Sequence, residues 1–371
     1  MKIHVDAVEA TKAIKAVASV IGVHPVAPVM SAIQLKVLNE GPDGELILRA
    51  TNGSVDIMRV IPCGAEETGE VLLDGKKLAS IFSTLPSGQA EIVAREGQNA
   101  ATIRSKGNAK FTLSVTGGEM PARPVVGEDG TAVVMNAEDL RNALETVKYA
   151  IATDQTRMIL TGILLEIYKD KINAVALDGY RLALSQKPCE ADGEETKLVI
   201  PGESLAAVLA ALDGSMEARL ETDGKQMLVR TDYTTVTTGL LVGDFIEYRK
   251  IIPRDYKCSI RFLARDMLDA LKRANAVGKI PLVKLRMEDT QAVVESNTND
   301  ASFYEEVPCQ HSGDDMNTAY NIKYLMELLG STKTDELQLD LISPTSAGVI
   351  RRTDGEKELH LLLPVRVVNA E

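Results

Sequence analysis

The chain has no tryptophan, and its aromatic residues make up only 4% of 371 positions. A core must therefore be built from Leu, Val, Ile, Ala and Met, which supply most of the 45% hydrophobic content. That content is ordinary for a globular chain and excludes a disordered one. The length is too great for one ordinary core and suits two or three domains.

Paired cysteines are lacking as well. The four cysteines lie far apart, no CxxC motif occurs, and the histidines show no spacing that would bind zinc. We therefore expect no metal and no other cofactor. Isolated thiols in a long chain predict buried, unpaired side chains in a reducing cytosol, here Cys63, Cys189, Cys258 and Cys309.

No apolar run approaches the roughly 18 residues that a membrane span would need. The Ala- and Val-rich stretch at residues 1–22 could pass for a secretion signal. Asp6, Glu9, Lys12 and Lys15 interrupt it at helical spacing, however, and predict an amphipathic helix. We expect a cytoplasmic protein with no membrane partner.

An excess of positive charge is also missing, since the formal net charge is −12. This argues against a protein that coats phosphate backbones, although a local basic surface could still meet DNA.

Motifs of catalysis are absent too. The stretch from Gly69 to Lys77 is the nearest approach to a phosphate loop, but its spacing is wrong and Lys77 stands where a hydroxyl residue would hold magnesium. No GxSxG or GxGxxG occurs. Asp178 to Leu182 (DGYRL) combines Asp, Tyr and Arg, yet Asp-Gly is the commonest signal of a hairpin turn.

What the chain does contain is a repeat. Pro-Cys occurs three times, at Pro62, Pro188 and Pro308, each time after two strand-like runs joined by a turn. The turns are at residues 51–53, 177–179 and 296–298. This repetition predicts three copies of one domain.

Each copy divides again into two half-units. A strand residue, an apolar residue five positions later and another four after that recur six times, and the last two share one helix face. Alternating segments broken by Gly, Asp or Asn follow each helix and predict roughly three antiparallel strands. The triplets are Val5/Ala10/Ile14, Leu73/Leu78/Phe82, Met135/Leu140/Leu144, Ile200/Leu205/Leu209, Phe262/Met267/Leu271 and Tyr320/Leu325/Leu329.

Composition shifts mark two linkers, at residues 121–130 and 252–255. The predicted fold is therefore α+β, with three repeated domains at 1–124, 131–253 and 257–371. Two features stay unexplained by the repeat. Arg181-Leu182 has no counterpart in the other turns, and the last apolar run contains Pro364, which must end the strand or lie at an edge and leave an apolar tail on the surface.

Three phrases in this order resemble the β-type sliding clamps of bacterial replication: ALDGYRLAL (176–184), GDFIEYRKIIP (243–253) and LLLPVRV (361–367). They are similar to that family's ATDGHRLA, FPDYRRVLP and VMPMRL, and the resemblance covers the whole chain. It implies a non-enzymatic, head-to-tail homodimeric ring of DNA-clamp domains, with helices inside and sheets outside. Duplex DNA would thread the hole without sequence preference.

The resemblance also implies a hydrophobic pocket for QLxLF-type peptides of DNA polymerases, the clamp loader and repair proteins. Two positions depart from the family, with Ile246 for Pro and Tyr180 for His, and the tail continues to Glu371. The implied pocket residues are Leu160, Leu177, Gly179, Tyr180, Arg181, Leu182, Ile246, Lys250, Ile251, Asn321, Tyr324, Leu361, Leu362, Leu363, Pro364, Val365 and Arg366.

Other roles carry over from the same resemblance. The DNA-facing candidates are Lys76, Lys77, Arg157, Arg265 and Lys323. Glu138 and Glu203 occupy the equivalent helical position in the second domain, so the lining would be mixed. The dimer-interface candidates are Phe111, Leu113, Ala276 and Val277.

Two alternatives remain at this stage. A clamp-like scaffold could bind partners without encircling DNA, and an enzyme could use a cleft near Asp178 and Arg181. Sixfold repetition leaves little unique sequence for a catalytic centre, which favours the clamp.

Overall fold

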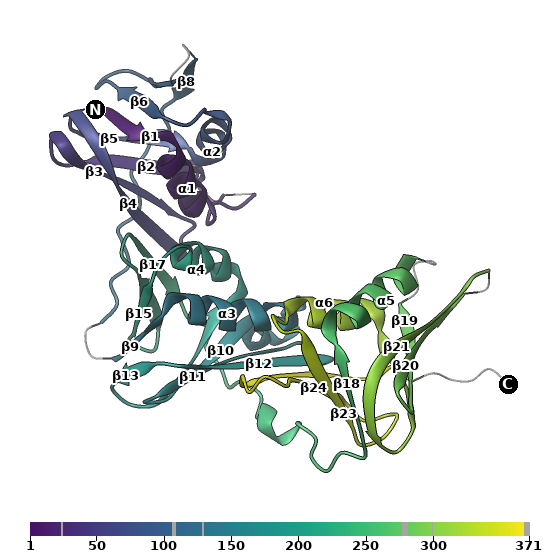
Figure 1. The fold of residues 1–371 in the computed structure, drawn as a ribbon. Coiled ribbons are helices and arrows are strands. Elements are labelled where there is room, and N and C mark those ends of the chain that lie inside the picture. Colours follow the sequence, from purple (N-terminus) through teal and green to yellow (C-terminus); the bar gives the residue numbers. More distant parts are fainter. Residues whose placement is uncertain (24, 106–108, 128–129, 277–280, 299, 367–371) are drawn as a thin grey trace. The chain divides into compact units, whose positions relative to one another are not determined.

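The computed structural model describes residues 1–371 except 24, 106–108, 128–129, 277–280, 299 and 367–371. The chain separates into two compact units (Figure 1). The first unit comprises Met1–Arg141, Cys189–Thr196 and Glu203–Leu240, and the second comprises Asn142–Pro188, Lys197–Gly202 and Leu241–Glu371.

The predicted half-unit is confirmed. In the described residues, the order strand, helix, three strands occurs six times, with one short additional strand, β13. The first two half-units comprise β1 (Lys2–Asp6), α1 (Ala7–Ala18), β2 (Ala32–Val37), β3 (Gly41–Thr51), β4 (Val55–Glu67), β5 (Gly69–Asp74), α2 (Gly75–Thr84), β6 (Gln89–Ala94), β7 (Ala100–Ser105) and β8 (Lys110–Ser114).

The middle pair follows the same order. It comprises β9 (Thr131–Asn136), α3 (Ala137–Val147), β10 (Gly162–Ile167), β11 (Lys171–Leu177), β12 (Arg181–Pro188), β13 (Glu190–Asp192), β14 (Thr196–Pro201), α4 (Leu205–Leu212), β15 (Glu217–Thr222), β16 (Gln226–Arg230) and β17 (Thr234–Gly239).

The last pair comprises β18 (Cys258–Leu263), α5 (Ala264–Ala276), β19 (Leu282–Glu288), β20 (Gln291–Asn297), β21 (Ser302–Gly313), β22 (Met316–Asn321), α6 (Ile322–Ser331), β23 (Glu336–Leu341), β24 (Gly348–Arg352) and β25 (Glu358–Leu362). Short 3-10 helices include η1 (Pro28–Ser31), η2 (Lys148–Ala150), η3 (Gln155–Thr161), η4 (Gly202–Ser204) and η5 (Tyr248–Lys250).

The helices begin where a strand ends on an Asp or Asn. The carboxylate of Asp6 accepts hydrogen bonds from the backbone of Val8 and Glu9 at 2.9 and 3.0 Å, and Asn136 does the same for Glu138 and Asp139. These side chains satisfy amide groups that have no partner within the first helical turn. The predicted amphipathic N-terminal helix is confirmed as α1, which buries Ala10, Ile14 and Val17.

Two consecutive half-units exchange their leading strands: the strand before the helix of one lies beside the first strand after the helix of the other. β1 lies beside β6 while β5 lies beside β2, and the same exchange joins β9 to β15, β14 to β10, β18 to β23 and β22 to β19. Because each half completes the other's sheet, neither half can fold as a separate layer. Helix α1 packs against α2, and α5 packs against α6 (Figure 1).

One sheet runs through each unit. In the first, β17 pairs with β4, which also pairs with β1, so the sheet continues from one pair of half-units into the next. In the second, β12 pairs with β25 in the same way. The alternating strand residues bury a core beneath the helices, as the period-2 pattern predicts.

The first two predicted turns have one geometry. Gly53 and Gly179 have φ values of 94° and 95°, which favour glycine, and the preceding Asn52 and Asp178 each accept two backbone hydrogen bonds. The third hairpin is longer, because β21 begins only at Ser302 and Thr298 caps the turn instead. Asp178 thus has the structural role that its turn predicted.

The structure also bears on the predictions for the last strand, the cysteines and membrane-spanning segments. The last strand, β25, ends at Leu362, two residues before Pro364, as predicted. Cys63, Cys189 and Cys258 are buried, but the expectation is wrong for Cys309, which is only partly buried although it packs against the core of the second unit. In the described part of the chain, no helix is long and apolar enough to cross a membrane.

Candidate functional site

Four predicted pocket residues from separate segments lie in one hydrophobic cluster of the second unit. Leu160 comes from η3, Leu177 from β11, Leu182 from β12 and Leu361 from β25, and all four are buried. Ile246 packs against them, partly buried. The other buried members of this group, here named the Leu160 cluster, are Ala152, Leu164, Val175, Val199 and Tyr248.

The β12–β25 pairing explains why the C-terminal run reaches this cluster. Leu182 lies opposite Leu361, and Arg181 lies opposite Leu362. Neighbouring residues of a strand point to opposite faces, so Leu361 enters the Leu160 cluster while Leu362 enters the other large core of the unit. Leu362 therefore does not share the cluster with the other predicted pocket leucines.

Exposed apolar side chains follow directly after the buried ones. Tyr180 is 61% exposed, and Leu363 and Val365 are each 42% exposed. The backbone amide of Leu363 donates to the Tyr180 carbonyl at 2.8 Å, and that of Val365 donates to Ala319 at 2.7 Å. Pro364 between them has no amide to satisfy. The predicted surface tail is confirmed over Leu363–Arg366, and it is held in place by two backbone hydrogen bonds.

Arg181 stands at the centre of a cluster of rings and carboxylates. Its guanidinium lies 4.2 Å from the Tyr324 ring centre and 5.2 Å from that of Tyr149, and it forms ion pairs with Asp178 and Glu327. Burial alone would lower the pKa of Arg181, but the hydrogen bonds to both carboxylates raise it. The side chain is a fixed cation held between two aromatic faces.

A chain of polar side chains that was not predicted lies beneath this arginine. The Tyr149 hydroxyl contacts His360 Nδ1 at 2.9 Å, and the other ring nitrogen contacts Glu358 at 2.9 Å. His360 is fully buried, and burial raises the pKa of Tyr149 well above its usual value. Burial would also raise the pKa of Glu358, but the hydrogen bond to His360 and the charge of Arg352 lower it. Only the inward position of His360 on its strand could have indicated this contact.

A buried carboxylate holds the segment that carries Ile246, Lys250 and Ile251. Glu166 of β10 accepts hydrogen bonds from both Arg249 terminal nitrogens, from the Tyr248 hydroxyl at 2.8 Å and from Asn173 at 3.1 Å. Burial would raise the pKa of Glu166, but these donors lower it to about 2. Glu166 was not among the predicted site residues.

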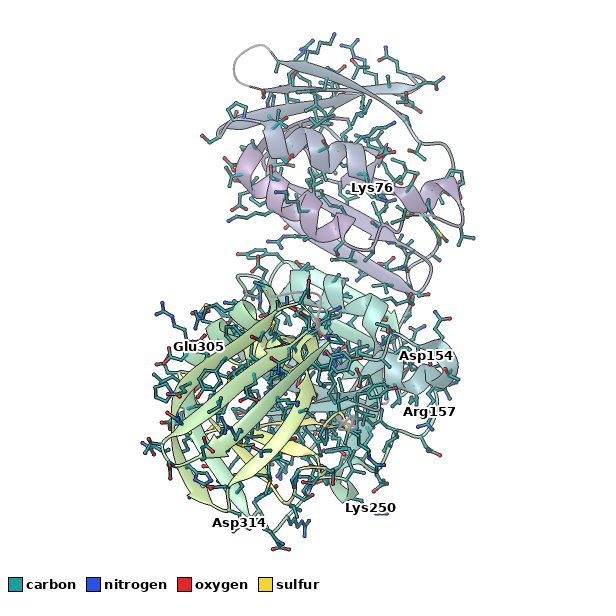
Figure 2. The ribbon with its side chains drawn as sticks, turned by 90° about the vertical axis from the view of Figure 1, so that its right-hand side faces the viewer. Lys76, Asp154, Arg157, Lys250, Glu305 and Asp314 are labelled. Atoms are coloured by element: carbon teal, nitrogen blue, oxygen red, sulfur yellow. The ribbon has the colours of Figure 1, made fainter. Side chains whose placement is uncertain are left out.

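The remaining predicted pocket residues are less closely associated. Lys250 is exposed at the surface (Figure 2), and Ile251 is 49% exposed. Neither forms a hydrogen bond or an ion pair with the tail in the part of the chain that the structure describes. Asn321 caps α6 by accepting from Lys323 and Tyr324, and Tyr324 brings its ring to 6.2 Å from that of Tyr180.

Three of the five basic candidates occupy the helix starts that the repeat predicted. Lys76, Arg265 and Lys323 are each the second residue of their helices, α2, α5 and α6. Arg265 and Lys323 are 91% and 77% exposed, with only long contacts to Asp269 and Glu327 at 3.9 Å. Lys76 donates to the Gly22 carbonyl, and Lys77 is exposed. Arg157 is exposed as well (Figure 2).

Two of the four dimer candidates lie at an open sheet edge in the described residues. Phe111 and Leu113 belong to β8, the last strand in the sheet order of the first unit. Ala276 is exposed at the end of α5, and Val277 lies outside the described residues. A second open edge was not predicted: Ser302–Pro308 of β21 pair with β20, and only the later part of β21 pairs with β18.

The cluster at Asp178 offers no sign of catalysis. Its carboxylate already accepts from the Tyr180 and Arg181 amides and from Arg181 Nε at 2.9 Å. Within the described residues, no group of three His, Cys, Asp or Glu side chains could hold a metal ion.

Six strand–helix–strand half-units that exchange their leading strands define the three-domain DNA-clamp class of folds. Sequence models of the DNA polymerase III beta subunit match the chain at residues 1–121 (N-terminal domain), 134–247 (central domain) and 249–366 (C-terminal domain). The chain therefore belongs to the DNA polymerase III beta subunit family. This is a family of non-catalytic processivity factors, so the predicted non-enzymatic role is confirmed by membership.

Individual relatives agree with this assignment. The beta sliding clamp of Synechococcus elongatus is 27% identical over 333 residues, which cover 87% of this chain and 88% of the relative. The beta subunit of Thermotoga maritima superposes with a TM-score of 0.89 at 22% identity, covering 99% of this chain and all of that one. The Bacillus subtilis sliding clamp superposes with a TM-score of 0.87 at 23% identity and the same coverage. At these identities, the superpositions show the fold alone.

Proposed function

We propose that two copies of this chain form a head-to-tail ring that encircles duplex DNA in the cytoplasm and tethers polymerases, the clamp loader and repair proteins to it. Helices would line the hole, and the link to DNA would be topological and independent of base sequence. Family membership supports this role, and so does the net charge of −12, because a ring that holds DNA by threading needs little affinity for phosphate.

The tethering site that we propose is the surface over the Leu160 cluster. The observation that carries it is the convergence of Leu160, Leu177, Leu182 and Leu361 directly beside the exposed Tyr180, Leu363 and Val365. Exposed apolar side chains next to a buried apolar floor suit the Leu and Phe of a QLxLF-type peptide. The polar groups of Arg181 and Asn321 would fix its Gln.

DNA contacts in this proposal come from the basic helix starts. Lys76, Arg265 and Lys323 occupy one repeated position, so each would present its charge to the hole in the same way. Lys77 and Arg157 would add to them. Since Glu138 and Glu203 occupy that position in the middle pair, contacts would be few and strongly dependent on salt.

The proposed ring closes by strand pairing. Each half-unit ends in the third strand after its helix. Two pairs of these last strands join within the chain, β4 with β17 and β12 with β25. The two third strands left over are β8 and β21, and both have an open edge in the described residues. We infer that β8 of one protomer pairs with the Ser302–Pro308 part of β21 in its partner. Phe111 and Leu113 lie on that edge.

Fluorescence anisotropy of a labelled QLDLF peptide tests the tethering site. We expect saturable binding to the full chain and its loss on truncation after Leu362, because this removes Leu363 and Val365 together with both hydrogen bonds that hold the tail. The matched control is truncation after Arg366, which leaves Leu363–Arg366 intact and should keep the binding. Equal affinities in both truncated proteins would place the peptide elsewhere.

A further inference from the structure

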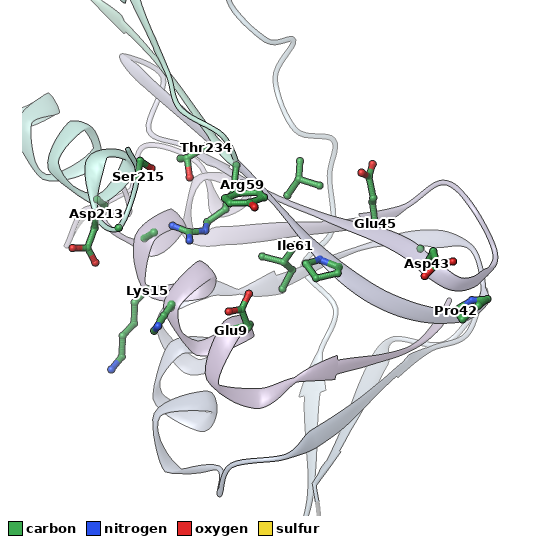
Figure 3. Close-up of a pocket in the computed structure, with 18 residues that line it drawn as sticks. Glu9, Lys15, Pro42, Asp43, Glu45, Arg59, Ile61, Asp213, Ser215 and Thr234 are labelled. Carbon is green, nitrogen blue, oxygen red and sulfur yellow. The ribbon is translucent and has the colours of Figure 1, made fainter. Parts of the chain in front are cut away.

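A second cleft lies in the first unit, among residues to which no function has been assigned above. It has a volume of about 920 Å³, and α1, the start of β3, the middle of β4 and the chain after α4 line it (Figure 3). The middle of β4 is open here because β17 pairs only with Val55–Arg59 and β1 only with Gly64–Glu67. We name it the β4 cleft.

The charges of the β4 cleft are unevenly distributed, although Asp213 lies near Lys15 and Glu9 lies near Ile61 (Figure 3). Arg59 and Lys15 lie toward one end, and Asp43 and Glu45 lie toward the other, with Ile61 between them (Figure 3). The Nε atom of Arg59 is buried and has no hydrogen-bond partner among the residues that the structure describes. A buried donor without an acceptor is costly, and a bound carboxylate would satisfy it.

The other charged groups are also available. Lys12 and Lys15 on α1, and Asp43 and Glu45 on β3, form no ion pair with any residue that the structure describes. Asp213 is the exception, since it pairs with Arg141. Glu9 of α1 also lines the cleft and forms no ion pair among the described residues. The end with Arg59, Lys12 and Lys15 therefore retains a net positive charge, and the end with Asp43 and Glu45 a negative one.

Because the chain is a repeat, three residues that line the β4 cleft have equivalents in the other half of the molecule. Counting from the matching helix caps Asp6 and Asn136, Lys12 corresponds to Asn142 and Lys15 to Glu145. Counting from Leu205 and Leu325, Asp213 corresponds to Lys333.

In the second unit, these equivalent residues contact one another. Lys333 lies 2.5 Å from the Asn142 side chain and 3.6 Å from Glu145, and Lys187 of the same region pairs with Glu356. The same repeated position is thus bridged by these contacts in one unit, whereas in the other unit Lys12 and Lys15 have no ion-pair partner among the described residues.

We propose that the β4 cleft is a second docking site, which takes a short polypeptide segment with an acidic side chain at one end and a basic side chain at the other. The acidic group would bind Arg59, Lys12 and Lys15, and the basic group would bind Asp43 and Glu45. Apolar residues between them would contact Ile61 and Pro62. The volume suits a few residues of peptide.

Charge complementarity favours polypeptide over nucleic acid. The cleft lining carries four carboxylates, Glu9, Asp43, Glu45 and Asp213, against the three cations Lys12, Lys15 and Arg59. A phosphate backbone would meet repulsion along half of the cleft, whereas a segment with both signs can match both ends.

A variant that copies the second unit tests the proposal. Lys12→Asn, Lys15→Glu and Asp213→Lys together introduce the residues that bridge the equivalent position. Random heptapeptides displayed on phage are first depleted on this closed variant and then selected on the full-length parent. We expect the survivors to share an acidic and a basic residue at a fixed spacing.

The best survivor is then synthesised with a fluorescent label and measured by anisotropy. It should bind the closed variant and Arg59→Ala at least about tenfold more weakly than the parent, because each loses charge-assisted hydrogen bonds. Lys169→Glu, a charge change at an exposed turn outside the cleft, should leave the affinity unchanged. Lys12→Ala and Lys15→Ala, both at exposed positions, give the same comparison if the closed variant melts early.

Three outcomes would overturn the proposal. The selection could yield no peptide that distinguishes parent from variant, or only peptides without an acidic residue. The selected peptide could bind Arg59→Ala as well as the parent. Finally, a labelled short DNA duplex could bind with the same dependence on Lys12, Lys15 and Arg59, which would make the occupant a nucleic acid.

Discussion

At the scale of single residues, Glu166 connects the strand β10 to the segment that carries Ile246. Five side chains surround its carboxylate: Arg249, Tyr248 and Asn173 donate to it, Lys197 lies 3.4 Å away, and Tyr168 lies at 3.5 Å. A buried charge with this many partners cannot lose its charge without leaving donors unsatisfied.

Glu166→Gln should therefore destabilise the protein by about 2 kcal/mol, because the buried carboxylate loses the charge that its hydrogen-bond donors stabilise, while Arg249, which is 49% exposed, can be solvated. Urea unfolding measures the change. Lys197→Ala is the control, since that side chain is 59% exposed and should cost less than about 1 kcal/mol. If the two substitutions cost the same, Glu166 does not anchor Arg249.

The same carboxylate predicts a dependence on pH. Its pKa falls from 4.5 to about 2 on folding, so the unfolded chain binds the proton more tightly. The stabilisation is complete above pH 4.5 and is lost as the pH falls toward 2. The stability difference between the parent and Glu166→Gln should hence shrink between neutral and acidic pH, and urea unfolding at both tests this. A constant difference would contradict it.

At the scale of elements, the unpaired edges of β8 and β21 are the clearest consequence of the repeat. The last strands of the other four half-units are β4, β12, β17 and β25. Each of them pairs with the last strand of another half-unit in the described part of the chain. Long open edges invite association, and pairing them in a ring would remove the hazard.

Phe111→Asp should shift the protein from dimer to monomer, raising the dissociation constant at least about tenfold, because it places a charge in the proposed strand interface. Light scattering after size-exclusion chromatography measures the mass. The matched control is Met216→Asp, at a position that is 83% exposed and away from β8. A monomeric parent protein would remove the proposed ring altogether.

At the scale of the whole molecule, a clamp and a scaffold differ in topology. A ring threaded by DNA should stay on closed circular DNA at high salt and leave once the circle is cut, because the link is mechanical and the ends then open. Gel filtration of labelled protein loaded onto circular DNA, before and after a restriction enzyme, distinguishes the two. Release from the intact circle at high salt would favour a scaffold that does not encircle DNA.

The sequence by itself determined the repeat and the local geometry. Period-2 and helical spacing predicted six half-units, Asp-Gly and Asn-Gly predicted two turns of equal geometry, and Pro364 predicted the end of β25. These features depend on residues close together in the chain, whose steric and hydrogen-bonding preferences act locally.

Only the tertiary structure decided which segments meet. The exchange of leading strands, the split between Leu361 and Leu362 and the burial of Glu166 beneath Arg249 join residues far apart in sequence. The same holds for the β4 cleft. Only the structure shows that Lys333 contacts Asn142 while the equivalent residues Asp213 and Lys12 line a cleft. Such contacts depend on the burial of distant groups in one core, and no local pattern encodes which partner a buried group will find.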